Sequence, residues 1–323
     1  MCAVGGRIDA GAIVAVAARA LGGRGRVVGV EWLRGGTRKG VYRVRVEGGR
    51  DVVVYVWGRA EHRWPEAAVE REGPFADPDG LDLFLGAVRV LEGAGVRVPE
   101  VEWVERDHPG PGVDMAVVED VPGPDLEGLL VRDRRAGVRV VERLGPVLET
   151  MASLRGTGWG RVSGAVRGEG ACERLVVERA LRDLVEGARR RPDLAAVCGR
   201  VERRVVEAAA GVGSRRRYGL VHGELGPDHV LVGAGGEPVL IDVEGTMFFD
   251  VEWEHVFVRL RFGDLYRLLE VPGLDGARLG LYEWAQRLSL VAGPLRLLEG
   301  GFADRRVLEG IVEAQMGWIG AHV

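Results

Sequence analysis

The sequence predicts an α+β fold in two lobes, the first built on an antiparallel sheet and the second mainly helical. Two patterns carry this prediction. Valine-rich runs separated by glycine-containing turns recur as far as Glu119, which is typical of short strands joined by tight turns. From Asp125 onward the apolar residues recur at helical spacing instead. We therefore expect a small lobe over residues 1–120, with about five antiparallel strands, and a helical large lobe over residues 121–323.

The small lobe is expected to begin with a helix. Ala10–Leu21 is apolar but is interrupted by Arg19 and has no basic leader, so we interpret it as a helix and not as a signal peptide. Three strands follow as a meander, then a loop rich in proline and charge, a helix and two more strands. In chain order their expected bounds are Gly25–Leu33, Gly40–Val46, Asp51–Trp57, His62–Asp79, Leu81–Glu92, Pro99–Arg106 and Val113–Glu119.

Helical spacing dominates the large lobe. Asp125 is placed to cap the first of its helices and Asp250 a later one, because a carboxylate before a helix can accept hydrogen bonds from the first N–H groups. Between them, apolar runs at Val230–Val232 and Val239–Ile241 flank a glycine-rich turn and predict a β-hairpin. The expected helices are Leu126–Arg134, Val138–Leu154, Cys172–Arg189, Asp193–Ala210, Val251–Arg261, Tyr266–Leu269, Leu274–Ala292, Pro294–Leu298 and Arg305–Ile319.

Composition and charge indicate which kinds of partner and which cellular setting to expect. The 323 residues are 28% charged and 46% hydrophobic, which is ordinary for a globular protein. A net charge of −4 gives no indication of a nucleic-acid-binding surface. The three cysteines are scattered, which predicts a reducing, cytoplasmic setting without a disulfide framework. No apolar run reaches the roughly 18 residues of a membrane span, so we expect no membrane partner.

The predicted hairpin brings two polar clusters together. His222, Glu224, Asp228 and His229 precede its first strand, and Asp242 follows directly after its second. Because the strands of a tight hairpin run antiparallel, the residues before the first strand lie beside those after the second.

The order His-Gly-Glu-Leu, then His229, a hairpin and Ile-Asp-Val-Glu resembles the catalytic core of the aminoglycoside phosphotransferase and choline kinase family, whose fold is protein-kinase-like. The resemblance implies that Glu224 takes the proton of the substrate hydroxyl and that Asp242 bridges metal and phosphates. It places His229 at the second metal ligand. Asp242 matches the family pattern, whereas Glu224 stands where the family has Asp and His229 where it has Asn. His222 and Glu254 are expected to hold the catalytic loop.

The departure at His229 bears on the choice between Mg²⁺ and Mn²⁺. Mg²⁺ prefers oxygen ligands, whereas an imidazole suits Mn²⁺ better. Asp228, the neighbouring residue, is a second candidate ligand beside Asp242. We therefore expect Mn²⁺ to support activity at least as well as Mg²⁺.

The same resemblance indicates a nucleotide site for ATP or GTP. It implies that Glu119 C=O and Val121 N–H face adenine, and that the turn after the first strand covers the phosphates. The residues expected at the phosphates are Gly35, Gly36, Thr37 and Lys39, with Tyr55.

A lysine is missing where kinase-like enzymes have one. Tyr55 stands at the third-strand position that normally carries it, and Phe84 stands near the place of its glutamate partner, with Asp82 as the alternative in a shifted register. We expect Tyr55 to pack on Phe84. Lys39 is the only lysine in the chain, and we expect its ammonium to contact the nucleotide phosphates in place of the missing one.

These residues leave three functions open. The first is a phosphotransferase that moves the γ-phosphate of ATP or GTP to a hydroxyl of a small molecule, an antibiotic or a metabolite. The second is a pseudokinase that binds nucleotide or a peptide partner without turnover, which the loss of the usual lysine and Asn favours. The third is a kinase-like enzyme acting on Ser or Thr of a peptide. The acids at positions 224 and 242 favour the first and third.

Overall fold

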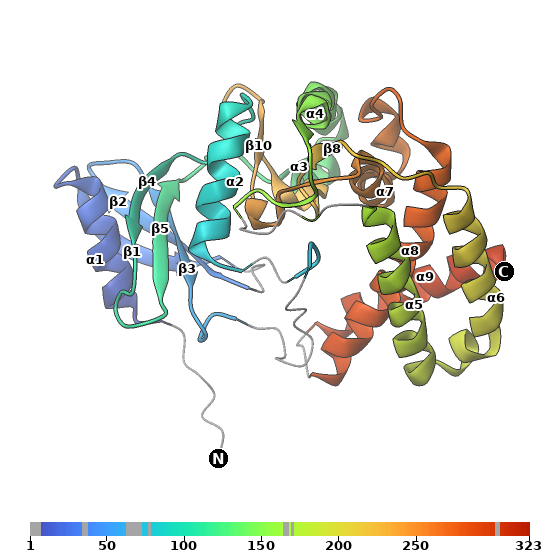
Figure 1. Ribbon diagram of the computed structural model, residues 1–323. Coiled ribbons are helices and arrows are strands. Elements are labelled where there is room, and N and C mark those ends of the chain that lie inside the picture. Colours follow the sequence, from blue (N-terminus) through green and yellow to red (C-terminus); the bar gives the residue numbers. More distant parts are fainter. Residues whose placement is uncertain are drawn as a thin grey trace, which may run out of the picture. The chain divides into compact units, whose positions relative to one another are not determined.

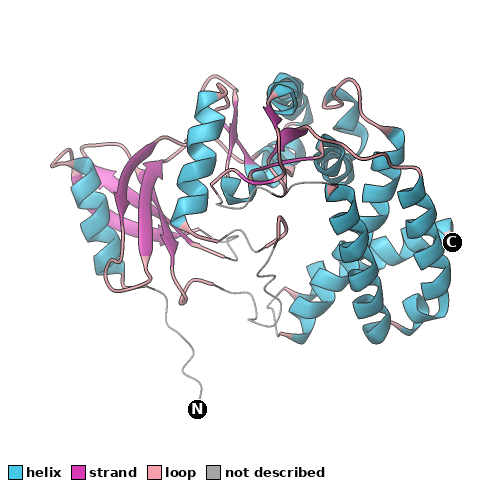
Figure 2. Cartoon of the chain, viewed as in Figure 1, coloured by secondary structure: helices cyan, strands magenta, loops and turns pink. Residues whose placement is uncertain are grey.

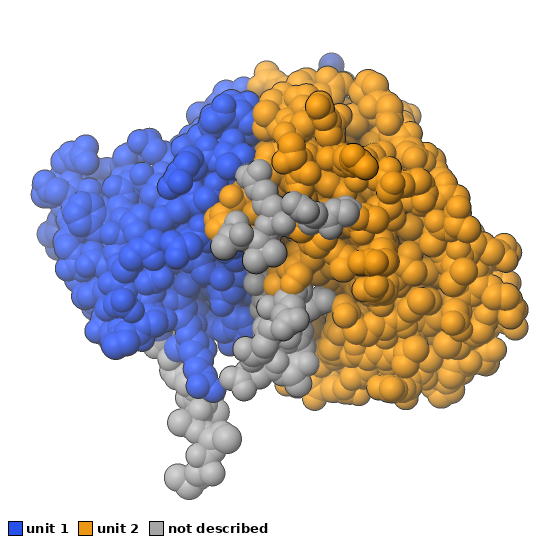
Figure 3. Space-filling model, in the orientation of Figure 1, with its two compact units in different colours: residues 1–64, 77–140, 228–244 blue, residues 65–76, 141–227, 245–323 orange. Residues whose placement is uncertain are grey.

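The computed structural model describes residues 8–33, 38–62, 73–76, 79–163, 168, 171–300 and 304–323. Contacts divide the chain into two compact units, each assembled from separate stretches of sequence (Figure 3). The first unit takes residues 1–64, 77–140 and 228–244, and the second takes residues 65–76, 141–227 and 245–323. The single boundary at residue 120 stays a prediction.

A five-stranded antiparallel sheet forms the centre of the first unit (Figures 1 and 2). Its strand order is β1-β2-β3-β5-β4, so the consecutive strands β1 to β3 form the predicted meander and β5 pairs with β3. The strands are β1 (Arg26–Trp32), β2 (Gly40–Glu47), β3 (Val52–Trp57), β4 (Val101–Glu105) and β5 (Asp114–Glu119). The predicted fold class is confirmed here, and the observed bounds fall within two residues of those that the valine runs predict.

Two helices cover opposite faces of the sheet. Alternate residues of β3 explain how, because successive side chains of a strand point to opposite faces. Val52, Val54 and Val56 pack in one core cluster with residues of α1 (Ala10–Leu21), whereas Tyr55 and Trp57 contact α2 (Leu81–Gly93). This central strand is buried along its whole length, which accounts for its unbroken apolar sequence.

The predicted hairpin belongs to the first unit. Its strands are β9 (Val230–Val232) and β10 (Pro238–Leu240). Leu240 N–H donates to Arg97 C=O at 2.9 Å, and Val232 N–H donates to Pro124 C=O at 3.0 Å. A Cβ on Gly123 would lie 1.7 Å from Val232 O, so this close backbone approach admits only glycine. The hairpin is thereby fixed to the chain on both sides of β5.

The predicted cap of the following helix is confirmed. The carboxylate of Asp125 accepts a hydrogen bond from Gly128 N–H at 2.6 Å at the start of α3 (Leu126–Arg132). An N-cap of this kind stabilises a helix by about 1 kcal/mol.

The second unit is mainly helical, with α5 packed against α8 at its core. A small sheet of order β6-β8-β11-β7 lies within it. Its strands are β6 (Arg155–Gly156), β7 (Gly160–Arg161), β8 (Tyr218–Val221) and β11 (Met247–Phe249). The helices are α4 (Arg134–Ser153), which begins in the first unit, α5 (Cys172–Arg190), α6 (Pro192–Ala210), α7 (Val251–Phe262), α8 (Gly276–Glu299) and α9 (Arg305–His322), with a 3₁₀ turn at Gly263–Leu268.

One helix boundary predicted in this unit is wrong. α8 runs without interruption through Pro294, where the sequence predicts a break before a separate helix. Proline lacks an N–H and costs a helix about 3 kcal/mol in its interior. Val291, Pro294 and Leu297 are all buried on this helix, so packing offsets the missing hydrogen bond.

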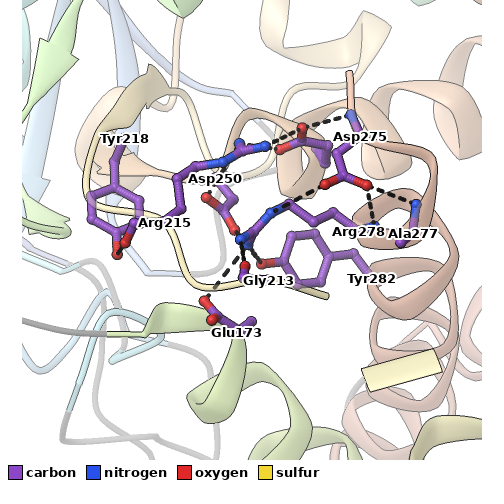
Figure 4. Close-up of polar contacts among 10 residues, drawn as sticks. Glu173, Gly213, Arg215, Tyr218, Asp250, Asp275, Ala277, Arg278 and Tyr282 are labelled. Atoms are coloured by element: carbon purple, nitrogen blue, oxygen red, sulfur yellow. Dashed lines mark hydrogen bonds and ion pairs between the residues drawn. The ribbon is translucent and has the colours of Figure 1, made fainter. Parts of the chain in front are cut away.

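The predicted cap by Asp250 is also wrong. Asp250 precedes α7, but its side chain makes no capping hydrogen bond. The carboxylate instead accepts from Arg278 Nη1 and Tyr282 OH, with Arg215 Nη1 at 3.4 Å (Figure 4). Asp250 is fully buried, and a buried carboxylate is stabilised far better by two guanidinium groups than by a helix N–H.

Among the described residues, none of the helices combines the length and the apolar character that crossing a membrane would require.

Candidate active site

The ends of the hairpin hold the predicted metal ligands together. Ile241 N–H donates to His229 C=O at 3.0 Å, which continues the hairpin pairing by one step beyond β10. His229 Nε2 consequently lies 3.4 Å from Asp242 Oδ2 and 3.8 Å from Asp228 Oδ2. The first unit thus brings all three side chains to one end of the hairpin.

Asp242 has an uncommon backbone conformation. Its φ is 61°, and among the described residues Asp107 is the other non-glycine residue with positive φ. Such conformations cost of order 1 kcal/mol or more and persist where the surrounding structure holds them. The Asp242 side chain is 46% exposed, so this residue with positive φ presents its carboxylate to solvent two residues after the buried strand β10 ends.

Lys39 reaches the same carboxylate from the start of β2. Its Nζ lies 2.8 Å from Asp242 Oδ1 and 2.5 Å from Glu244 Oε1, and 4.7 Å from the centroid of the Tyr55 ring. Burial by itself would lower the pKa of this ammonium, but the two carboxylates raise it above its ordinary value. Lys39 is therefore charged at neutral pH, and it leaves this group of one ammonium and two carboxylates with a net negative charge.

Tyr55 and Phe84 pack as expected. Their rings meet edge to face with centroids 5.5 Å apart, and Trp57 lies 5.4 Å from the same Phe84 ring. Burial, which Lys39 partly opposes, raises the pKa of Tyr55 to about 12, so its hydroxyl stays neutral. Asp82, the alternative in the shifted register, is 78% exposed and pairs with Arg106 at 2.5 Å. That alternative is wrong, and an aromatic pair stands between β3 and α2.

The remaining nucleotide residues fall in two places. Glu119 ends β5, and its carboxylate accepts from Arg97 at 2.7 Å and from Glu100 N–H at 3.2 Å. Burial acts to raise the pKa of Glu119, but the hydrogen bonds from Arg97 and from Glu100 N–H together with the nearby arginine charges outweigh it, so the pKa lies below its usual value. Val121 is buried two residues later. The residues expected over the phosphates, Gly35, Gly36 and Thr37, lie outside the described residues.

The loop that carries Glu224 lies in the second unit and is held by Glu254. Glu254 Oε2 accepts from Gly223 N–H at 2.7 Å and Oε1 from Leu225 N–H at 3.3 Å. Gly223 has φ of 100°, which suits glycine at this bend. His222 is fully buried beneath the loop, whereas Glu224 is exposed. The two anchored N–H groups on either side of Glu224 fix the backbone from which its carboxylate projects.

Glu254 is itself a perturbed acid. It is buried within α7, and burial raises its pKa to about 7, although the backbone N–H donors act in the opposite direction. The loop is thus held by a carboxyl group that titrates near neutral pH.

Glu244 carries a contact that the sequence did not assign. It lies two residues after Asp242 and pairs with Lys39 across 205 residues of sequence. The motif Ile-Asp-Val-Glu shows the acid, but no pattern in the sequence indicates its partner.

A second cluster of donor groups does not form a metal site. Cys172, Glu173 and Asp250 offer ligand atoms within 4.8 Å of one another. Arg278 Nη1 already bonds Asp250 and lies 3.6 Å from Glu173, so a guanidinium balances their charge. Burial also raises the pKa of the Cys172 thiol, which disfavours the thiolate that a metal requires.

Comparison with known proteins gives the chain a family context. A family model described as the phosphotransferase enzyme family matches residues 30–285. No curated protein matches the chain. Solved structures that resemble it include the aminoglycoside phosphotransferase APH(4)-Ia, at 17% identity and a TM-score of 0.61, with 95% of this chain and 98% of that one covered.

Two further structures contain bound molecules. A thermostable mutant of APH(4)-Ia, solved as a ternary complex with ADP and hygromycin B, is 17% identical with a TM-score of 0.58 and covers 92% of this chain and 96% of its own. The spectinomycin phosphotransferase APH(9)-Ia, solved with ADP and spectinomycin, is 12% identical with a TM-score of 0.57 and coverages of 89% and 88%. At these identities the likeness establishes a shared fold.

Proposed function

Because the chain belongs to the phosphotransferase enzyme family, we propose that it transfers the γ-phosphate of ATP or GTP to a hydroxyl of a small molecule, an antibiotic or a metabolite. The observation that carries the proposal is the end of the hairpin, where His229 Nε2 and Asp242 Oδ2 lie 3.4 Å apart. The bound ADP, hygromycin B and spectinomycin of similar structures support a nucleotide and a hydroxyl-bearing acceptor as the two substrates.

The donor set fits a divalent metal ion. Carboxylate oxygens of Asp242 and Asp228 with one imidazole nitrogen of His229 suit Mn²⁺, and the carboxylates alone suit Mg²⁺ with water. Bound there, the ion would offset the negative charge of the nucleotide phosphates. The exposed carboxylate of Asp242 is the main ligand in this proposal.

Further residues of the first unit would bind the nucleotide. Backbone N–H groups of Gly35, Gly36 and Thr37 would hold phosphate oxygens, as glycine-rich turns do. Lys39 adds a cation beside Tyr55. The backbone of Glu119 and Val121, at the end of β5, would pair with the adenine edge.

Glu224 acts as the proton acceptor. The acceptor oxygen forms a bond to the γ-phosphorus as the bond from that phosphorus to the β,γ-bridging oxygen breaks, and ADP or GDP leaves. The hydroxyl proton passes to the Glu224 carboxylate, which has the same chemistry as the Asp of related sequences. Its exposed position on a loop fixed by Glu254 suits a group that must meet a substrate.

The test is release of ADP or GDP with a panel of aminoglycosides, spectinomycin and amino sugars. We expect turnover with at least one acceptor, loss of turnover in Asp242→Asn, and a decrease of about 10²-fold in Glu224→Gln. Asp107→Asn is the matched control, because Asp107 shares the positive φ of Asp242. Near wild-type turnover in Asp242→Asn would refute the proposal. Nucleotide binding with no turnover on any acceptor or on Ser and Thr peptides would favour the pseudokinase alternative, which the aromatic pair at Tyr55 and Phe84 supports.

A further inference from the structure

The only lysine of the chain is buried, and it contacts two acids that follow the hairpin. Lys39 is 7% exposed, and its Nζ lies 2.5 Å from Glu244 Oε1 and 2.8 Å from Asp242 Oδ1. All three residues belong to the first unit, so these distances lie within one compact body. Of the 44 lysine and arginine residues in the chain, Lys39 is the one lysine. Its retention at this position indicates a need for a compact ammonium group that a guanidinium cannot replace.

The two acids differ in exposure. Glu244 is 5% exposed, whereas Asp242 is 46% exposed. The two oxygens of Asp242 also face different groups, since Oδ1 lies at Lys39 and Oδ2 at His229. Glu244 is therefore buried against the ammonium, while Asp242 retains an open side towards solvent and the imidazole.

One carboxylate is enough to neutralise the ammonium of Lys39. The second carboxylate therefore gives the group of Lys39, Asp242 and Glu244 a net negative charge. A metal ion on Asp242 would compete with Lys39 for that carboxylate. Glu244 would then be the acid that keeps Lys39 in place. The ammonium has three N–H donors, so it can keep a bond to Glu244 and still donate to a phosphate oxygen.

The usual arrangement of kinase-like sites is absent among the described residues of β3 and α2. There a lysine of the third strand pairs with a glutamate of the helix and contacts the phosphates. Here the inward positions hold Tyr55 and Phe84 in an edge-to-face contact, and Asp82 turns outward to Arg106. Lys39 Nζ lies over the face of that same Tyr55 ring, at 4.7 Å from its centroid.

We propose that Lys39 and Glu244 form a relocated lysine–glutamate pair, in which Glu244 is the positioning residue that holds the ammonium for the nucleotide phosphates. The inference rests on the proposed function, and it assigns Glu244 to the lysine and not to the metal. With a metal ion held by Asp242, Lys39 would give up its contact with that carboxylate and keep its bond to Glu244.

The experiment is isothermal titration of the full chain with AMP-PNP, in Mn²⁺ and in EDTA, and with adenosine. Lys39→Ala and Glu244→Gln should each weaken AMP-PNP binding tenfold or more in Mn²⁺ and leave adenosine binding unchanged. Lys39→Arg should also weaken it, because the planar guanidinium cannot replace the ammonium. Asp242→Asn should weaken AMP-PNP binding in Mn²⁺ but not in EDTA, whereas Lys39→Ala should weaken it in both.

The controls separate positioning from folding. Removing Lys39 alone leaves the two carboxylates together without their cation. The double substitution Lys39→Met with Glu244→Gln removes both charges of the pair. It should lose no more affinity than Lys39→Ala, because the two residues act as one unit. Arg45→Gln breaks an ion pair of β2 with Asp51 at 2.7 Å, and should leave binding unchanged.

Three results would overturn the inference. Wild-type affinity of Lys39→Ala or of Glu244→Gln for AMP-PNP would remove the phosphate role. Equal loss of AMP-PNP and adenosine binding would make the pair structural only. A wild-type chain that binds neither AMP-PNP nor GMP-PNP would refute the proposed function together with the inference. The first two results would refute the inference alone and leave the proposed function standing.

Discussion

The buried ion cluster at the start of α7 offers the most direct test of what holds the second unit together. Replacing Asp250 by Asn removes the charge that Arg278 and Tyr282 share (Figure 4). Arg278 is 2% exposed, so the substitution leaves a guanidinium in the interior without its principal counter-charge.

The magnitude follows from the contacts that remain. Breaking one side of a buried ion pair costs about 3–5 kcal/mol. Arg278 would retain Glu173 at 3.6 Å and Asp275 at 3.9 Å, and Arg215 would retain Glu252 at 2.7 Å. These weaker contacts put the expected loss at the lower end, about 3 kcal/mol, which is a factor of about a hundred in an opening equilibrium.

Hydrogen–deuterium exchange resolved by peptide is the suitable assay, because a chain of two units need not unfold in one step. Peptides of α7 and α8 should exchange about a hundredfold faster in Asp250→Asn, while peptides of β1 to β3 should not change. Asp250→Asn with Arg278→Met should recover part of the loss, since it removes the buried guanidinium that Asp250→Asn leaves without its principal counter-charge. Arg26→Gln breaks a pair that is largely exposed and should have little effect. An acceleration below tenfold in α7 and α8 would refute the account of Asp250 as the centre of this cluster.

Two further predictions concern pH and metal. The folded pKa of Glu254, about 7, lies above its unfolded value of 4.5, so the folded chain binds this proton more tightly. The proton therefore stabilises the folded chain fully below pH 4.5. This contribution to the free energy of unfolding, up to about 3 kcal/mol, is lost as pH rises through 7. The unfolding midpoint of the wild type should therefore fall relative to Glu254→Gln between pH 5 and pH 8, and a constant difference would contradict the assignment. Mn²⁺ should support turnover at least as well as Mg²⁺, because His229 Nε2 lies beside Asp242. His229→Asn should shift the metal preference towards Mg²⁺. A strict Mg²⁺ requirement in the wild type would place the imidazole outside the coordination shell.

The secondary structure was largely determined by local pattern. The bounds of α1 agree with the prediction at both ends, and those of α2 to within one residue. The five strands of the sheet β1-β2-β3-β5-β4 follow from valine runs and glycine turns, because side chains that alternate between two covered faces leave a recognisable sequence pattern. The packing of Tyr55 on Phe84 was also predictable, since a missing lysine and a missing acid in facing positions leave two aromatic rings to fill the space.

The motifs around the hairpin gave the family and the identity of the candidate residues. They did so because phosphoryl transfer requires particular groups in a particular order along the chain, and the model of the phosphotransferase enzyme family matches residues 30–285. His229 and Asp242 met at the end of the hairpin as two antiparallel strands require.

Charged partners were decided only by the tertiary structure. Asp250 precedes a helix, as a cap does, yet it bonds Arg278 from a helix that begins 26 residues later. Glu244 pairs with Lys39 across 205 residues of sequence, and no local pattern encodes that contact. An ion pair depends on which side chains are brought together and on how much water is excluded around them, and both are properties of the folded chain. The sequence therefore indicated the candidate residues of the site, and the fold decided which acids contact the single lysine.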